Sequence, residues 1–168
     1  MKKLLALAVV IFTFSASYAQ GPHMFVNSET VFKSISRYTA ALEQLEEMAA
    51  QYQKNIETAY SQIEEAHDTY QSQQANLSQI GRQNYEDAIA KAEDEVARYQ
   101  EDIFGQDGEM IKKRIELIKP IQDSVFAAIN KYAEDNKYTM VMDIATNPNL
   151  IYYSPALDKT QEIINLVK

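Results

Sequence analysis

The sequence predicts a mainly α-helical protein with a small β body, from which a long antiparallel helical hairpin projects as an arm. Three observations predict this fold. Apolar residues recur every three and four positions through the middle of the chain, a second stretch repeats that spacing after a glycine, and short β-type runs stand near both ends. The low content of glycine and proline, four of each in 168 residues, also favours long helices.

The first residues have the three parts of a secretory signal peptide. A positive segment with Lys2 and Lys3 precedes an apolar run, residues 4–14, that is too short to span a bilayer. A small-x-small cleavage site ends at Ala19. We therefore expect residues 1–19 to be removed and the mature chain to be exported. A retained membrane anchor is the alternative, and it would need a longer apolar run.

The composition argues against several classes of function. Removal of the two lysines of the signal takes the formal net charge from −8 to −10, and an acidic chain repels nucleic acids and anionic lipid surfaces. The chain has no cysteine, so it offers no disulfide and no thiolate for redox chemistry or zinc binding. No later stretch approaches the about 20 apolar residues of a spanning helix, so we expect no membrane-spanning segment.

A seven-residue apolar repeat predicts the first long helix. The repeat gives a narrow seam instead of a broad core-facing stripe, so this helix needs a second helix alongside it. A helix over residues 41–80 would extend about 60 Å. The seam consists of Ile35, Tyr38, Leu42, Leu45, Ala49, Tyr52, Ile56, Ala59, Ile63, Ala66, Tyr70, Leu77 and Ile80.

The pattern stops at Ile80 and Gly81, and glycine commonly marks the end of a helix. A second seam of the same spacing then runs from Tyr85 to Ile103. We interpret the two stretches as an antiparallel hairpin with its tip near Gly81 and its seams packed together. A turn elsewhere, or one continuous parallel coiled coil, is the alternative. The glycine and a polar gap at residues 71–74 favour the hairpin.

Residues 104–110 place two glycines in otherwise helical sequence, and the apolar phase shifts after them. We interpret this stretch as a joint between arm and body, with an ordinary interhelical loop as the alternative. The arm then comprises residues 41–110, and the body comprises residues 20–40 and 111–168. Pro120 should kink the helix that follows the joint.

Both ends of the chain are expected to supply strands to the body. Strand candidates are residues 24–27, 139–144 and, after an Asn-Pro-Asn turn, 150–153, and Asp158 with Gln161 predicts a capping box for a final helix. A three-stranded sheet with open edges is too small to hold such an arm, so we expect it to join several copies of the chain. The expected oligomerisation residues are Phe25, Val26, Val141, Ile144, Ile151 and Tyr152.

The sequence offers no convergent catalytic site, since neither a Ser-His-acid set nor a glycine-rich phosphate loop is present. Glu64, His67 and Asp68 share a helix face with spacings that a metal site can use, but a solvated acidic surface is the simpler interpretation. Asp143 stands in a strand of the body, where a hydrogen-bonding role is expected. We therefore predict no enzyme, no metal site and no cofactor.

The mature chain resembles, over nearly its whole length, the Skp/OmpH family of periplasmic chaperones for outer-membrane proteins. HMFVNSETVF, residues 23–32, resembles the opening strand and helix start of that family. Residues 111–168 resemble its closing half, with a Pro-Ile pair, a Val-x-Asp strand, a tyrosine-containing strand and an Asp-capped helix. The resemblance implies a jellyfish-like homotrimer in the periplasm, whose three arms enclose a cavity that holds unfolded outer-membrane proteins without ATP.

The charge of the arm departs from the resemblance. Residues 61–100 carry three basic and eight acidic residues, whereas the best-known members have basic arms that attract clients and lipopolysaccharide. Lipopolysaccharide binding therefore does not carry over, and client binding would rest on apolar and polar contacts or on basic patches of the client. An exported coiled-coil spacer or adaptor is the alternative function. The expected client-contact residues are Tyr60, Tyr70, Leu77, Ile80 and Tyr85.

Overall fold

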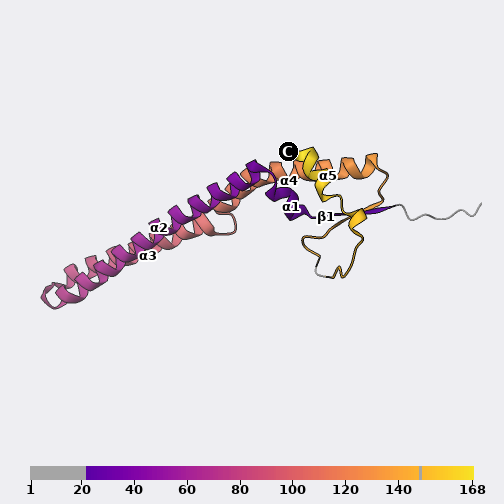
Figure 1. The fold of residues 1–168 in the computed structure, drawn as a ribbon. Coiled ribbons are helices and arrows are strands. Elements are labelled where there is room, and N and C mark those ends of the chain that lie inside the picture. Colours follow the sequence, from indigo (N-terminus) through magenta and orange to yellow (C-terminus); the bar gives the residue numbers. More distant parts are fainter. Residues whose placement is uncertain (1–21, 148) are drawn as a thin grey trace, which may run out of the picture.

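The computed structural model describes residues 22–147 and 149–168, so the expected signal peptide lies outside the described residues. The chain is mainly helical, and two long helices project from a smaller region that contains both described ends (Figure 1). The elements in order are β1 (His23–Val26), α1 (Ser28–Lys33), α2 (Ser36–Gln73), the 3-10 turn η1 (Gln74–Asn76), α3 (Gln79–Phe104), α4 (Glu109–Asp135), β2 (Met140–Asp143), the 3-10 turn η2 (Pro155–Leu157) and α5 (Thr160–Val167).

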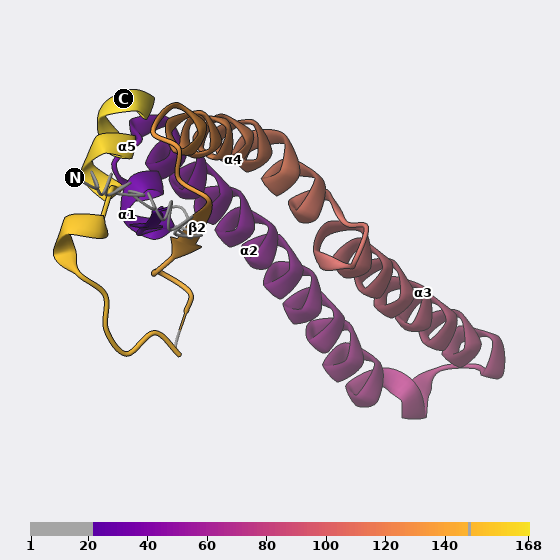
Figure 2. The ribbon, with the colours of Figure 1, turned by 90° about the vertical axis from the view of Figure 1, so that its right-hand side faces the viewer.

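The predicted helical hairpin is confirmed, since α2 and α3 run antiparallel and bury a common seam (Figure 2). The chain reverses through η1 and the two residues that follow it, so the helix end expected at Gly81 was placed too late. The α2 helix stops at Gln73, in the polar gap where the seam has no apolar residue. Gly81 lies inside α3, where its N–H donates to Oγ of the N-cap residue Ser78 at 3.1 Å.

A tight turn breaks the helical sequence between α3 and α4, while α2 runs unbroken beside both (Figure 2). A Cβ at Gly105 would lie 2.4 Å from the carbonyl oxygen of Glu101, and one at Gly108 would lie 2.5 Å from that of Ile103. The turn therefore needs glycine at both positions because the backbone approaches too closely for a side chain. The helix α4 continues through Pro120.

The sheet of the body has two parallel strands in the described part of the chain. The prediction of a third strand is therefore wrong. β1 pairs with β2 in a register that sets Met24 opposite Val141. Residues 150–153 form no strand, and Ile151 and Tyr152 are exposed. The other edge of β1 is already used within the chain, because the Lys159 N–H donates to the Phe25 carbonyl at 2.8 Å. Residues 150–153 therefore pair with neither strand, although a hairpin would have set them against the outer edge of β2.

The core of the body is built from both ends of the chain. Its most deeply buried side chains come from β1, α1, α4 and α5, which explains why these distant segments lie together (Figure 2). The final helix begins at Thr160 instead of directly after Asp158, so the predicted capping box is wrong. The Asp158 carboxylate accepts from the Thr160 N–H at 2.9 Å, and Gln161 bonds Asn165. The fully buried side chains are Met24, Val26, Val31, Val125 and Ile163.

Asp143 ties the end of β2 to the start of α1. Its carboxylate accepts hydrogen bonds from the Ser28 hydroxyl, from the Ser28 N–H at 3.1 Å and from the Ala145 N–H at 2.9 Å. Burial raises the pKa of Asp143, but these three hydrogen bonds outweigh it and hold that pKa below its usual value. Asp143 therefore has the hydrogen-bonding environment expected of a structural carboxylate.

Candidate binding groove on the arm

An open apolar groove of about 510 Å³ runs along the arm between α2 and α3. Ile63, Ile89 and Val96 are the buried residues of its floor. The groove stays open because alanines occupy many of the positions where the two helices face each other, and a methyl group does not fill the space between helix backbones. Its lining consists of Asn55, Ala59, Gln62, Ile63, Ala66, Tyr85, Ala88, Ile89, Ala92, Glu95, Val96 and Tyr99.

A pair of tyrosines stands at each end of the groove. Tyr85 stacks on Tyr70 with ring centroids 5.7 Å apart, and Tyr99 meets Tyr52 edge to face at 6.4 Å. Each pair contributes one ring from each helix, so the pairs also bind the two helices to each other. The aromatic surface that borders the groove therefore comes from Tyr85 and Tyr99.

The tyrosines behind these rings are held by carboxylates. The Tyr70 hydroxyl donates to Glu86, and this hydrogen bond is the largest cause of the raised pKa of Tyr70, followed by desolvation. A hydrogen bond to Glu109 likewise raises the pKa of Tyr52. A hydrogen bond to a carboxylate stabilises the neutral phenol, so both side chains stay protonated in physiological conditions.

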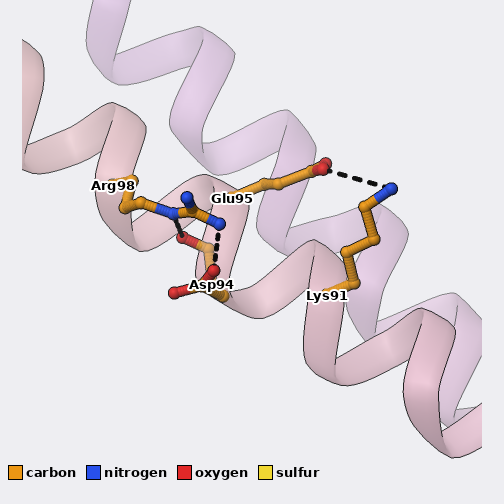
Figure 3. Close-up of polar contacts among 4 residues, drawn as sticks. All are labelled: Lys91, Asp94, Glu95 and Arg98. Carbon is orange, nitrogen blue, oxygen red and sulfur yellow. Dashed lines mark hydrogen bonds and ion pairs between the residues drawn. The ribbon is translucent and has the colours of Figure 1, made fainter.

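Charged residues are nearly absent from the lining of the groove. Glu95 is the exception, and its carboxylate pairs with Lys91 one turn earlier in α3 at 3.7 Å (Figure 3). Asp94 and Arg98 form a second pair within the same helix (Figure 3). These exposed pairs keep the arm hydrated and contribute little to its stability.

The residues expected to contact clients are spread along the arm instead of forming one site. Tyr85 borders the groove, and Tyr70 is half-buried behind it. Ile80 is 75% exposed near the tip, Leu77 is half-buried in the turn, and Tyr60 is exposed outside the groove lining. Their contact with clients stays a prediction.

The apolar repeat of the sequence does not reveal the groove. Ala59 and Ala66 lie on the predicted seam of the first long helix, Ala92 lies within the second seam, and Ala88 lies beside it. The available signal was the number of alanines at or beside seam positions, since small residues in both helices leave a gap when they face each other. Which alanines face one another depends on the axial alignment of α2 and α3, which the packing of the seam and the tyrosine pairs define across the two helices.

The six residues expected to join copies of the chain fall into two groups. Phe25 and Val26 are buried within their own body, and Val141 and Ile144 are half-buried there. Ile151 and Tyr152 remain exposed, and Ile151 is 99% exposed. Their role in assembly stays a prediction, and only the exposed pair presents whole apolar side chains to a second copy.

On the acidic face around His67, the imidazole lies close to a carboxylate of the facing helix. The Nε2 atom of His67 lies 3.0 Å from the Glu93 carboxylate of the facing helix. Within residues 22–147 and 149–168, no group of three histidine, aspartate or glutamate side chains is arranged to hold a metal ion. In the same ranges, no helix combines the length and the apolar character needed to cross a membrane.

A projecting two-helix arm with an open apolar groove, carried on a small body, defines the architectural class of this protein. The chain belongs to the OmpH-like family, because the family model described as "Outer membrane protein (OmpH-like)" matches residues 23–167. The resemblance inferred from the two ends of the sequence is thereby confirmed. A search of curated proteins finds no match to this chain. The family is one of chaperones and is not known for enzymes.

Proposed function

We propose that this chain is an ATP-independent periplasmic holdase that binds unfolded outer-membrane proteins between its arms and prevents their aggregation. The family match over residues 23–167 is the observation that carries this proposal. The cleavable signal peptide expected at residues 1–19 agrees with the compartment, because it would deliver the chain across the inner membrane.

The arm supports this function through its shape. A groove that is open along its length accepts a chain from the side, and many weak apolar contacts bind an unfolded polypeptide without selecting one sequence. The exposed Ile80 adds an apolar contact near the tip. The contacts require no nucleotide, since they need neither a covalent step nor a driven conformational change.

A homotrimer is the assembly that we propose, by analogy with the family. The exposed side chains of Met140, Ile151 and Tyr152 on the body support assembly because exposed apolar residues favour association. Association of three bodies would place three arms around one central cavity. We expect no nucleic acid and no lipopolysaccharide among the ligands, because the arm is acidic.

An aggregation assay tests this function directly. A urea-denatured outer-membrane β-barrel protein is diluted into buffer with and without the purified mature chain, in the absence of ATP, and light scattering is followed. Suppressed scattering, with a client–trimer complex in size exclusion with in-line mass measurement, is the expected result. Unchanged aggregation by a folded and oligomeric protein would contradict the holdase and favour the coiled-coil spacer or adaptor.

A further inference from the structure

We propose that the groove between α2 and α3 binds an extended, uncharged segment of the client about five or six residues long, and that charged segments bind poorly there. This inference rests on the proposed holdase function and adds the chemical class of the bound segment.

The length of the groove sets the length of the segment. The lining runs from Asn55 to Ala66 on α2, about 16 Å along the helix axis, and from Tyr85 to Tyr99 on α3, about 21 Å. An extended chain advances about 3.3 Å per residue, so about five or six residues occupy this length. Alternate side chains of an extended segment point to one side, so about three of them would enter the groove.

The polar groups of the lining suit a peptide backbone. Asn55 and Gln62 present carboxamides, which both donate and accept hydrogen bonds, as the main chain does. The Asn55 side-chain oxygen accepts from Gln51 at 2.9 Å, which orients its amide group. Hydrogen bonds from carboxamides to the main chain do not depend on the client sequence, as a holdase requires.

The placement of charge excludes charged segments from the groove. Residues 61–100 contain eleven charged side chains, three basic and eight acidic, yet Glu95 alone among them lines the groove. Its charge is already paired with Lys91. A lysine or glutamate of the client would lose hydration in the groove and gain no free partner charge, which disfavours its binding. An apolar or neutral polar side chain incurs no such penalty.

A matched pair of exposed alanines in α3 tests the proposal. Ala88 lines the groove, and Ala90, two residues further on, does not. Ala88→Glu and Ala88→Lys are compared with Ala90→Glu and Ala90→Lys in the full mature protein. The probe is a short fluorescein-labelled peptide of alternating leucine and serine, and binding is measured by fluorescence anisotropy.

Both substitutions at Ala88 are expected to weaken binding of the probe about tenfold, because a charge of either sign disturbs an uncharged site. Both substitutions at Ala90 should leave the dissociation constant within about twofold. Replacing the serines of the probe with lysine or with glutamate should weaken its binding to the unsubstituted protein. Helix content by circular dichroism checks that every variant is folded.

A second measurement does not depend on the stability of a charged variant. The chain has no cysteine, so Ala88→Cys and Ala90→Cys each carry a single environment-sensitive dye. The probe should shift the emission of the dye at position 88 to shorter wavelength and leave the dye at position 90 unchanged. Equal responses at the two positions would overturn the proposal.

The remaining outcomes separate this inference from the holdase function. If the unsubstituted protein suppresses barrel aggregation but the Ala88 and Ala90 variants bind the probe equally, the groove proposal fails and the holdase stands. Opposite effects of Ala88→Glu and Ala88→Lys would show recognition of client charge and also overturn the proposal. A change of molar mass in the Ala88 variants would instead identify the groove as a contact between copies. If the unsubstituted protein suppresses no aggregation, both proposals fall together.

Discussion

The arm and the body use the same kinds of side chain but bury them to different depths. In the body, β1, α1 and α4 pack against α5, and Ile163 of α5 is 0% exposed. In the arm, two helices alone enclose Ile89, which remains 6% exposed and borders the open groove. The body therefore has a core in the usual sense, whereas the arm has only a seam whose side chains lie one layer of residues from solvent.

Deletion of one isoleucine side chain in each region gives the largest expected contrast. Ile163→Ala should lower the free energy of unfolding by about 4 kcal/mol, and Ile89→Ala by about 2 kcal/mol, because an open groove leaves no closed cavity behind. Urea unfolding followed by circular dichroism measures both, at one protein concentration since the chain is expected to oligomerise. An equal loss in the two variants would contradict the distinction between core and seam.

The next largest effect on stability is expected in the turn between α3 and α4, and Gly81 inside α3 serves as the control. Gly108→Ala should cost about 2 kcal/mol of stability, because the new Cβ would lie 2.5 Å from the Ile103 carbonyl oxygen. Gly81→Ala should stabilise by up to about 1 kcal/mol, because its Cβ would meet Ser78 Oγ at 3.4 Å, an ordinary contact inside a helix. Thermal unfolding distinguishes the two, and a stabilising Gly108→Ala would show that the turn relaxes easily.

The carboxylate of Asp143 should make the body sensitive to acid. The folded-state pKa of Asp143 is lowered, so its contribution is complete above its unfolded pKa of about 3.9 and is lost as the pH falls through the folded value. Asp143→Asn should cost about 1 kcal/mol at neutral pH, because Ser28 and Ala145 lose a charged acceptor.

Urea unfolding at neutral and acidic pH tests this contribution. The difference between Asp143→Asn and the unsubstituted protein should shrink as the pH falls through the folded-state pKa, since the native carboxylate then becomes neutral as well. A difference that stays constant into acid would mean that the charge of Asp143 does not contribute.

The smallest effect is expected for the exposed ion pairs of the arm. Lys91→Ala should change the free energy of unfolding by less than about 0.5 kcal/mol, because both partners of the Lys91–Glu95 pair are mostly exposed to solvent. Thermal unfolding at low and high salt checks this value. A loss comparable to that of Ile89→Ala would mean that the arm depends on its surface charges instead of its seam.

The sequence by itself determined the arm, because the information for a coiled-coil seam is local and repeated. The repeat is visible in the local sequence from Ile35 to Tyr70 and from Tyr85 to Ile103. Each of these seams needs a second helix to cover it. The hairpin and the break at the paired glycines Gly105 and Gly108 could therefore be predicted. The position of the reversal could not be fixed as well, because Ser78 competes with Gly81 as the signal for a helix boundary.

Only the tertiary structure decided the sheet and the groove, because both depend on segments that meet across the fold. Residues 150–153 have the composition of a strand, but they pair with neither strand of the described sheet, and Lys159 instead bonds the outer edge of β1. The alanines that open the groove, such as Ala59 and Ala92, are ordinary seam residues in either helix alone. They form a binding surface only where the two helices bring them together, since a gap is a property of both faces and not of either sequence.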